Sequence, residues 1–572
     1  MTTEKPANIV NAFQQSVAQL TGSEAPWAID TKTVNHIDYR FYKNAPTTLM
    51  ALINEGRKHG ENEFIIYEGE RISFDEFFKR ADTLSIALTK KFAITSGDTV
   101  AIAMRNYPEW MISFVAIAQT GATVVPLNSW GKSAELVHAL KDSGAKVAFM
   151  DQARFDLVAG ALDDLGTTAI IAKPEAQSSN SVDELIAEFS ADLTESTTFD
   201  DKAGTDDLAI MMYTSGTTGL PKGTLSTHQN VCQSIFNFEL LAIATAMTDS
   251  EPVGKMLERG FPPKVLLSVP LFHVAGAYSV FLLSLRAGRP IVMMHKWDKI
   301  KALEYIQNER CTMMSAVPTM LMELLECKEW NDYDTSSMFG FGAGGSVQPA
   351  RLPKTIYQKL PDSYPGTGYG MTESNACGFA ATGAIFAQYP TSTGIASPIL
   401  DCKILDNQGN ECPQGEPGEI YLKSPTIAKG YNNQPEATKE TFIDGWLKTG
   451  DIGYLNDDGY LFITDRIKDM IIRGGENIYS VEVEAAALTH EQILEAAAFG
   501  LPHDTLGEEL ALAVYVEANA LSEEAIQQHI ASQLAGFKVP SRVFIESQPL
   551  PKNATQKILK NKIKESALEV VS

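Results

Sequence analysis

Three patterns that mark common classes of protein are missing from this 572-residue sequence. No two cysteines form a C-x-x-C pair or stand at zinc-ligand spacing, which excludes a zinc site of that kind. No run of 18 apolar residues occurs, so we expect no integral membrane segment. Residues 1–6 lack the apolar core of a signal peptide. These absences predict a soluble, cytoplasmic protein.

The cysteines themselves are few. Cys402 and Cys412 could face each other across a hairpin, but a reduced pair is the expectation for a cytoplasmic protein. The six cysteines are Cys232, Cys311, Cys327, Cys377, Cys402 and Cys412.

Basic residues are also fewer than acidic ones. The sequence has 47 lysines and arginines against 71 aspartates and glutamates, which gives a formal net charge of −24. Such a surplus repels nucleic acids and anionic membranes, so we expect neither as a partner. Any polyanionic ligand must therefore be held by local donors. There is no G-x-x-x-x-G-K-[ST] loop and no G-x-S-x-G elbow, which excludes P-loop enzymes and α/β-hydrolases.

The chain is long enough for several structural units, and 44% of its residues are hydrophobic. From residue 99 onward, short apolar runs alternate with amphipathic stretches. This alternation predicts an α/β fold with layered parallel sheets, in which ligands bind beyond the carboxyl ends of strands. Strands are expected at residues 99–104, 146–150, 169–172, 208–213, 264–270 and 290–295, and helices at 109–119, 134–140 and 300–309.

Near residue 394 the pattern changes to short strands and Gly/Pro turns, which predicts a small β-rich subdomain. The last hundred residues have an α+β pattern of their own, with a strand at 510–516 and a helix capped by Ser522. The expected division is an N-terminal arm at 1–45, a large N-terminal domain at 46–466 with the β-rich subdomain at about 395–465, and a small mobile C-terminal domain at 467–572.

A loop of glycine and hydroxyl residues follows the strand expected at residues 208–213. Backbone N–H groups and short O–H donors can surround a phosphate there, and Lys222 adds a cation on a flexible stem. The alternative is an ordinary glycine-rich turn, but such turns rarely hold four hydroxyls and a lysine beside three glycines. The loop predicts a phosphate site made of Thr214, Ser215, Gly216, Thr217, Thr218 and Lys222.

Two motifs further along carry groups that suit a nucleotide and a metal ion. The ring of Tyr369 can stack on a flat base, Thr372 offers a hydroxyl, and Glu373 is a hard oxygen ligand for Mg²⁺. Asp451, in a Lys-Thr-Gly-Asp string, can accept hydrogen bonds from both hydroxyls of a ribose. Taken alone, each motif is better explained as a structural turn.

In this order the motifs resemble those of the acyl-adenylating (AMP-binding) superfamily, and the chain is most similar to a fatty-acid or related acyl-CoA synthetase. The resemblance covers nearly the whole sequence. It implies that Tyr369 contacts adenine, Thr372 the α-phosphate and Glu373 Mg²⁺. It also places Asp451 and Arg466 at the ribose. Finally, it places Gly344 and Gly345 in the loop that holds adenine and the acyl group, although the following Ser346 replaces a commoner alanine.

The roles of the C-terminal motifs follow from the resemblance alone. It implies a hinge at Lys468, a pantetheine tunnel lined by Gly474 and Gly475 in the second reaction step, and a catalytic Lys557 that bridges the substrate carboxylate and the α-phosphate. Without the resemblance, we would interpret the segment from Arg466 to Ile478 as a β-turn and Lys557 as a solvated side chain. Gln556 replaces the family's glycine, and we expect it to take an ordinary φ with an added amide contact.

His273 stands where acyl-CoA synthetases carry the histidine beside the reacting carboxylate, although a lone histidine is more often structural. No acidic residue occurs from Pro270 to Arg286. An α-amino acid would leave its ammonium group desolvated and unpaired there, which is unfavourable. Amino-acid activation is therefore not expected.

The function implied is ATP-dependent activation of a carboxylic acid, an aliphatic fatty acid by preference, to acyl-AMP. Transfer to coenzyme A would follow, with release of pyrophosphate and AMP. ATP, Mg²⁺ and coenzyme A are the expected cofactors, and a homodimer is left open. Four alternatives stay open: an acyl-AMP ligase that delivers to a carrier protein, an aryl-acid CoA ligase, a luciferase-like oxidative enzyme, and a non-catalytic nucleotide-binding regulator.

Overall fold

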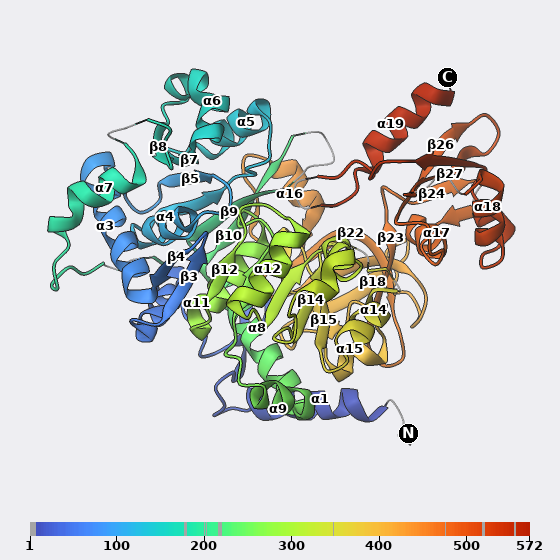
Figure 1. Cartoon of the computed structure of the whole chain (residues 1–572), viewed down its shortest axis with the longest axis horizontal. Helices are drawn as coiled ribbons and strands as arrows, with labels where there is room; N and C mark the ends of the chain where they lie inside the picture. Colours follow the sequence, from blue (N-terminus) through green and yellow to red (C-terminus); the bar gives the residue numbers. More distant parts are fainter. Residues whose placement is uncertain are drawn as a thin grey trace.

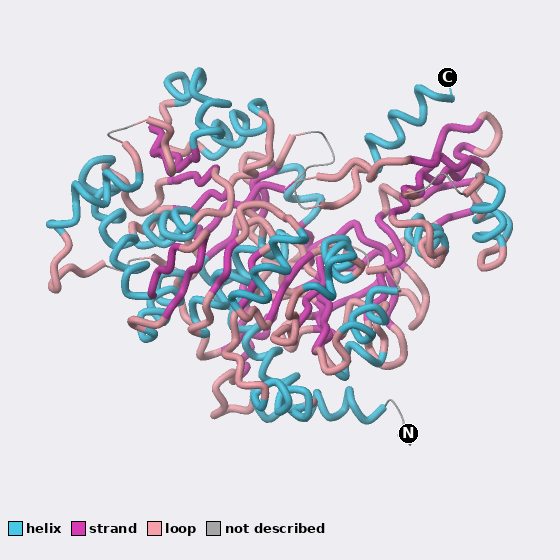
Figure 2. The backbone as a smooth tube through the Cα atoms, viewed as in Figure 1, coloured by secondary structure: helices cyan, strands magenta, loops and turns pink. Residues whose placement is uncertain are grey.

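The computed structural model describes residues 7–176, 180–199, 201, 203–214, 220–346, 348–349, 351–474, 476–517, 521–553 and 556–571. A large body of strands and helices is followed by a smaller one at the C-terminal end (Figure 1). Figure 2 shows strands gathered toward the middle of the large body, with helices around them. The expected α/β class is confirmed, with a large N-terminal part and a small C-terminal part.

Two sheets form the large body. Within the described residues, the first sheet has seven strands and is parallel from β9 to β8. In sheet order its strands are β20 (Gly430–Tyr431), β10 (Lys222–Thr227), β9 (Leu208–Thr214), β6 (Thr123–Pro126), β5 (Thr99–Ala103), β7 (Val147–Asp151) and β8 (Thr168–Ala172).

The second sheet has nine strands in the described part of the chain, and its middle is parallel from β15 to β3. In sheet order its strands are β17 (Ile395–Ala396), β16 (Phe379–Thr382), β15 (Tyr364–Tyr369), β14 (Gly340–Gly344), β13 (Met313–Ala316), β11 (Val265–Leu267), β12 (Ile291–Met293), β3 (Glu63–Tyr67) and β4 (Glu70–Ser73). The strands expected at 264–270 and 290–295 are therefore present but shorter than predicted, because the chain leaves the sheet after Leu267 and after Met293.

The main hydrophobic core takes side chains from both sheets. Trp110 on α4 (Pro108–Gln119) is fully buried and stacks on Phe114, with ring centroids 5.4 Å apart. Phe281 meets both rings edge-on. Helices that connect or cover the strands include α3 (Phe74–Phe92), α5 (Ser133–Ser143), α6 (Gln152–Leu165), α7 (Val182–Phe189), α8 (His228–Thr248), α12 (Lys299–Glu309), α13 (Pro318–Leu325) and α14 (Arg351–Lys359).

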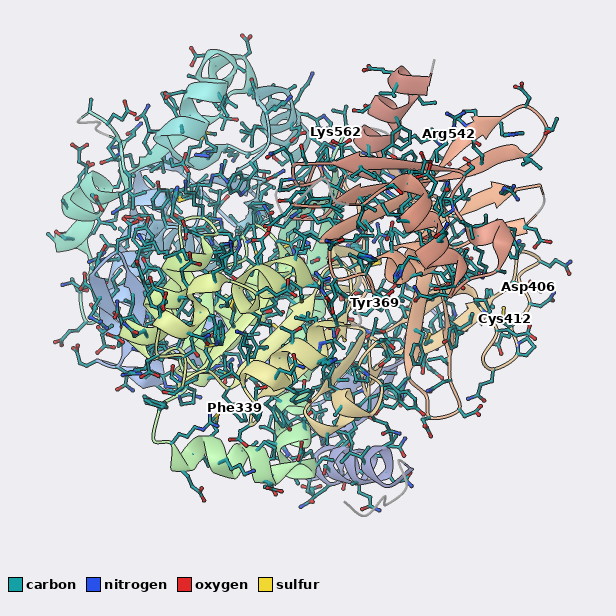
Figure 3. The ribbon with its side chains drawn as sticks, turned by 45° about the vertical axis from the view of Figure 1, so that its right-hand side comes forward. Phe339, Tyr369, Asp406, Cys412, Arg542 and Lys562 are labelled. Carbon is teal, nitrogen blue, oxygen red and sulfur yellow. The ribbon has the colours of Figure 1, made fainter. Side chains whose placement is uncertain are left out.

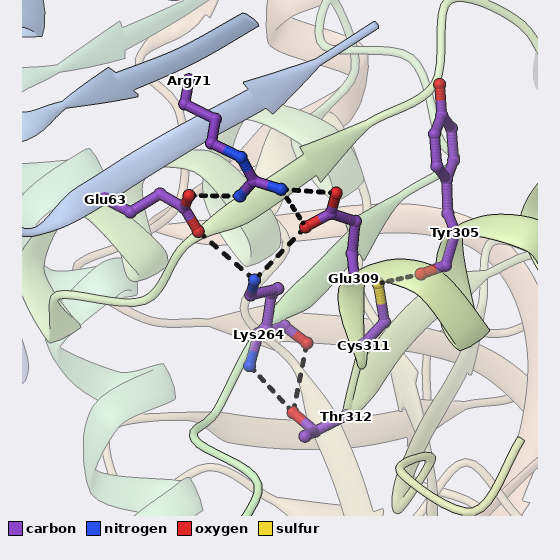
Figure 4. A network of polar contacts seen from close by, with 7 residues as sticks. All are labelled: Glu63, Arg71, Lys264, Tyr305, Glu309, Cys311 and Thr312. Carbon is purple, nitrogen blue, oxygen red and sulfur yellow. Dashed lines mark hydrogen bonds and ion pairs between the residues drawn. The ribbon is translucent and has the colours of Figure 1, made fainter. Parts of the chain in front are cut away.

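An ion-pair network ties the β3–β4 hairpin, at the edge of the second sheet, to α12 and to the segment before β11 (Figure 4). The guanidinium of Arg71 pairs with Glu63 and, at 2.7 Å, with Glu309 at the end of α12. Lys264, just before β11, lies 3.3 Å from Glu63 and 3.6 Å from Glu309. Each carboxylate thus contacts both cations, so the network joins segments that are far apart in the sequence.

The N-terminal segment is structured. Helix α1 (Ala7–Thr21) packs beside α8, and a hairpin of β1 (Ile29–Val34) and β2 (Ile37–Tyr42) follows it (Figure 1). Val10 and Phe13 on α1 are buried in a small hydrophobic cluster. These contacts attach residues 7–42, which belong to the segment that we expected to form an arm, to the large body.

Helix α8 is the one described helix that is long and apolar enough to cross a membrane by length and composition. It carries buried polar residues with partners inside the protein. Asn237 accepts from the Tyr42 hydroxyl at 2.7 Å, and Ser234 donates to the carbonyl of Asn375 at 2.6 Å. This pattern is that of a helix inside a folded core.

The β-rich subdomain is a sheet of β18 (Asp401–Leu405), β19 (Gly418–Lys423), β22 (Trp446–Leu455), β21 (Phe442–Ile443) and β23 (Leu461–Arg466). Asp406 and Cys412 lie at its outer edge (Figure 3). All six cysteines are free thiols in the structure.

The C-terminal part has a hydrophobic core of its own, between a sheet and the helices that pack on it. Its helix α18 (Glu523–Ala531) begins after Ser522, whose hydroxyl accepts from Ala525 N at 3.2 Å, as predicted. The sheet consists of β25 (Glu476–Ile478), β24 (Ile471–Arg473), β27 (Gly507–Tyr515), β26 (Glu495–His503) and β28 (Arg542–Glu546), and the other helices are α17 (Ser480–Ala487) and α19 (Lys560–Val571).

Candidate active site

The carboxyl ends of β14 and β15 form one edge of the site. The two strands are parallel, with Gly344 opposite Gly368, so the loops that leave them start side by side. The turn after β15 is tight, because a Cβ at Gly370 would lie 2.5 Å from the carbonyl oxygen of Ala376. Tyr369 lies where the large body faces the C-terminal part (Figure 3). The predicted residues on this edge are Gly344, Gly345, Tyr369, Thr372 and Glu373.

Asp451 is the centre of a second group. It lies opposite Arg466 across the antiparallel pair of β22 and β23, and Arg466 Nε is 2.9 Å from Asp451 Oδ1. The hydroxyl of Tyr369 donates to Asp451 Oδ2 at 2.7 Å. Burial alone would lower the pKa of Arg466, but the negative charges around it, that of Asp451 first among them, together raise the pKa. Each oxygen of the buried Asp451 carboxylate therefore has one partner, Arg466 or Tyr369. The same oxygens can instead accept hydrogen bonds from the two hydroxyls of a ribose.

Glu373 is 7% exposed and accepts at Oε1 from the hydroxyl of Tyr431 at 2.9 Å. Burial raises its pKa, against the opposing effects of a backbone hydrogen bond and the Tyr431 hydroxyl. No group of three or more His, Cys, Asp or Glu side chains that could hold a metal ion occurs among the described residues. One hard carboxylate fits Mg²⁺, which proteins commonly bind through one or two carboxylates together with substrate phosphates.

The glycine-hydroxyl loop closes a hairpin between β9 and β10, where Thr214 pairs with Lys222. Ser215, Gly216, Thr217 and Thr218 lie outside the described residues. Lys222 Nζ lies 5.0 Å from the ring centre of Tyr431. The hairpin therefore brings Lys222 to the neighbourhood of Glu373 through one shared tyrosine.

Lys557 comes from the C-terminal part, where its backbone N–H donates to Asn553 Oδ1 at 2.9 Å. Burial and the nearby charge of Arg466 lower its pKa to about 8, against the opposing charge of Asp451. These charges act on Lys557 because the C-terminal part brings its side chain to the Asp451 group. The structure therefore unites residues that are more than 100 positions apart.

The predicted hinge residue, Lys468, and the predicted pantetheine loop, with Gly474 and Gly475, lie outside the Asp451 group. Lys468 is exposed in the turn between β23 and β24. Gly474 has φ +61° and donates to the carbonyl of Leu506 within its own sheet. Gly475 lies outside the described residues.

The expectation of an ordinary φ at Gln556 is wrong. Its φ is +63°, in the left-handed region that glycine normally fills. Its backbone N–H donates to the carbonyl of Asn553 at 3.0 Å, and Asn553 N donates to the carbonyl of Lys557 at 2.8 Å. Lys552 and Ile558 form a β-bridge on either side of this turn. The turn requires a positive φ at position 556, whichever side chain the residue carries.

His273 precedes the short helix α10 (Val274–Gly276), and its Nδ1 accepts from Ala275 N at 3.3 Å. Burial lowers its pKa to about 4, so the ring is neutral at pH 7. A π-helical segment, η3 (Ala277–Leu282), follows, and such segments are frequent at functional sites. Tyr278 in this segment donates to Asn375 Oδ1 at 2.8 Å, which joins it to the loop after Glu373.

The sequence interpretation missed several residues that hold these groups. Tyr431 stands in a Gly-Tyr pair with no distinctive spacing to Lys222 or Glu373. Asn553 is visible in the sequence only as a turn residue near Lys557. Their partners depend on contacts between distant segments, so no local signal could have found them.

The AMP-binding enzyme family matches residues 53–432, and the AMP-binding enzyme C-terminal domain matches residues 482–557. A long-chain-fatty-acid–CoA ligase, FadD13 of Mycobacterium tuberculosis, is 33% identical over 86% of this chain and 93% of its own length. A feruloyl-CoA synthase of an Amycolatopsis species is 31% identical, over 87% of this chain and 94% of its own.

Among solved structures, ATP-bound MatB from Rhodopseudomonas palustris covers 91% of this chain and 100% of its own, with 26% identity and a TM-score of 0.79. The apo form of MatB gives a TM-score of only 0.68, with 27% identity over 92% of this chain and 100% of its own. The arrangement of this chain is thus more similar to the ATP-bound form. The chain therefore belongs to the AMP-binding enzyme family and is an AMP-forming acid–thiol ligase that uses ATP, Mg²⁺ and coenzyme A.

Proposed function

We propose that this ligase activates an apolar monocarboxylic acid, an aliphatic fatty acid, to acyl-AMP and then transfers the acyl group to coenzyme A. The observation that supports the first step best is the approach of Lys557 to Asp451 and Arg466, close enough for their charges to shift its pKa. A carboxylate and a phosphate repel each other, and a mobile cation between them offsets that repulsion.

In the first step, a carboxylate oxygen of the acid attacks the α-phosphorus of ATP and pyrophosphate leaves. Lys557 lies between the two anions, and Thr372 donates to the α-phosphate. Asp451 accepts from the ribose hydroxyls and exchanges its bond from Tyr369 for one of them, which frees the Tyr369 ring to lie against adenine beside Gly344 and Gly345.

The triphosphate is held by the loop from Thr214 to Lys222, whose other members are Ser215, Gly216, Thr217 and Thr218. Glu373 would hold Mg²⁺, which supplies positive charge to the phosphates when bound. Arg466 supports Asp451 by the ion pair at 2.9 Å. Lys222 supplies the cation of the loop.

In the second step, the thiol of coenzyme A loses its proton to solvent, the thiolate attacks the acyl carbonyl, and AMP leaves. We infer that the C-terminal domain, residues 467–572, turns at Lys468 between the steps. This movement withdraws Lys557 and brings Gly474 and Gly475 to the pantetheine arm. Hinge movements of this kind assemble alternate sites in many enzymes.

The acid is inferred from the charges near His273. No lysine, arginine, aspartate or glutamate occurs from residue 270 to residue 285. Arg286, the next cation, is already paired with Glu239 at 2.6 Å and Glu55 at 2.8 Å. A second carboxylate or an ammonium group on the substrate would therefore lie in an apolar region without a partner, which is unfavourable.

Pyrophosphate release from ATP across a panel of acids, each with coenzyme A, tests the proposal. We expect turnover with aliphatic monocarboxylic acids and little with amino acids, dicarboxylic acids or aryl acids. Preference for ferulate or coumarate would instead identify an aryl-acid CoA ligase. Turnover only with a phosphopantetheinyl carrier protein would identify an acyl-AMP ligase and overturn the assignment of coenzyme A as the acceptor.

A further inference from the structure

Tyr431 contacts two residues of opposite charge in the site at once. Its hydroxyl donates to Glu373 Oε1 at 2.9 Å, and its ring lies 5.0 Å from Lys222 Nζ. Its ring also packs edge-on against Phe442, at 5.4 Å and 66°. One rigid side chain therefore carries a hydrogen bond to the carboxylate and a cation–π contact to the lysine.

The backbone fixes Tyr431 in this place. It ends β20, which pairs with β10 in a register that sets Tyr431 opposite Thr224, two residues after Lys222. Tyr431 N donates to Thr438 Oγ1 at 2.9 Å. Ala428 N donates to the carbonyl of Glu373 at 2.8 Å, so this short segment is bound to the backbone of Glu373 as well.

The tyrosine also keeps the two charges apart. The ion pairs of the described residues include none between Lys222 and Glu373. A direct pair would consume the cation needed for a phosphate and the carboxylate needed for a metal ion. A neutral hydroxyl occupies only Oε1 of Glu373, and an aromatic face holds the lysine without neutralising it.

We propose that Tyr431 is a positioning residue of the adenylation step, which holds Glu373 ready for Mg²⁺ and Lys222 ready for the ATP phosphates while preventing their direct pairing. This inference rests on the roles of Glu373 and Lys222 in the proposed function. It adds a residue that orients two groups, the carboxylate proposed for Mg²⁺ and the lysine proposed for the ATP phosphates.

The test compares Tyr431→Phe, which removes only the hydroxyl, with Tyr431→Leu, which removes the aromatic face as well. Tyr421→Phe, on β19 of the β-rich subdomain, is a matched control. The hydroxyl of Tyr421 also donates to a carboxylate, Glu419, at 3.4 Å, and Lys403 lies 5.4 Å from its ring centre. Thermal melting of each variant establishes that it is folded.

Binding of ATP is measured by calorimetry with and without Mg²⁺ and without acid, so that no turnover occurs. In Tyr431→Phe we expect the gain in ATP affinity from Mg²⁺ to fall about tenfold, as when a hydrogen bond to a charged group is lost. Affinity without Mg²⁺ should stay unchanged. Tyr431→Leu should lose affinity under both conditions, and Tyr421→Phe should match the wild type.

The two half-reactions give a second readout. Tyr431→Phe should raise KM for MgATP in adenylation and leave thioester formation from supplied acyl-AMP unchanged. An unchanged Mg²⁺ gain in Tyr431→Phe, beside a wild type that binds MgATP, would overturn this proposal alone. A wild type that binds no ATP would overturn the proposed function, and this inference with it.

Discussion

Asp465 and Ser480 join the two sides of the expected hinge. Ser480 Oγ donates to Asp465 Oδ1 at 2.8 Å, and the backbone N–H of Ser480 donates to Asp465 Oδ2. Asp465 lies at the end of β23, before Lys468, and Ser480 begins α17 after it. Lys560 Nζ completes the group, at 2.6 Å from Ser480 Oγ and 2.6 Å from Glu484. A turn at Lys468 would separate Asp465 from the other three, so these bonds stabilise the present arrangement.

We therefore expect Asp465→Ala to shift the enzyme away from adenylation. The substitution removes hydrogen bonds to a charged acceptor, which contribute about 1.5–3 kcal/mol each. The rate of acyl-AMP formation, relative to thioester formation from supplied acyl-AMP, should fall about tenfold or more. Asp406→Ala is the control, because Asp406 accepts turn hydrogen bonds at the outer edge of the β-rich subdomain. An unchanged ratio of the two rates in Asp465→Ala would contradict the expectation.

Lys557→Ala should remove adenylation selectively. If Lys557 offsets the repulsion between carboxylate and α-phosphate, its loss slows acyl-AMP formation by about 10²–10³. Thioester formation from supplied acyl-AMP should persist, because the C-terminal domain would have withdrawn the lysine by then. Lys562→Ala, at an exposed position on the helix α19 that follows Lys557, is the control. Acyl-AMP formation by Lys557→Ala at the wild-type rate would show that the assignment is wrong.

The pH dependence of adenylation follows from the same residue. Lys557 acts as a cation, and its pKa of about 8 means that it loses its proton as the pH rises through 8. Single-turnover acyl-AMP formation should therefore be constant near pH 7 and decline above about pH 8. Thioester formation should not decline there, because the thiolate of coenzyme A is the nucleophile and becomes more abundant. An adenylation rate that stays level to pH 9.5 would exclude Lys557 as the required cation.

Much of the fold could be predicted because its signals are local. The run at residues 208–213 and the helix after Ser522 contain their own strand and capping patterns, and both occur within a residue or two of their predicted positions. Asp451 and Glu373 were predicted as site residues from motif strings, which can be read in the sequence without three-dimensional information. The contacts of Asp465 with Ser480 could not be predicted, because they form only when the C-terminal part packs against the β-rich subdomain.

Gln556 is the clearest case in which a correct motif gave a wrong local structure. Glutamine can take φ +63°, but a non-glycine residue in that conformation is disfavoured, by roughly 1–3 kcal/mol when held there. The turn is imposed by the hydrogen bonds between Asn553 and Lys557, so the side chain cannot relax it. The cost of this conformation is thus offset by contacts on either side.

Gln556→Gly should therefore increase stability rather than leave it unchanged. Glycine removes the strain but gains entropy in the unfolded chain, so the net increase in the free energy of unfolding should be at most about 1 kcal/mol. The control is the same substitution at an exposed helical position, Gln528→Gly in α18, which should decrease that free energy by about 0.5–1 kcal/mol. Urea unfolding of the two variants measures whether each substitution increases or decreases the free energy of unfolding. A decrease for Gln556→Gly would mean that the glutamine side chain makes a stabilising contact that exceeds the strain, and that the family's glycine was replaced for that contact.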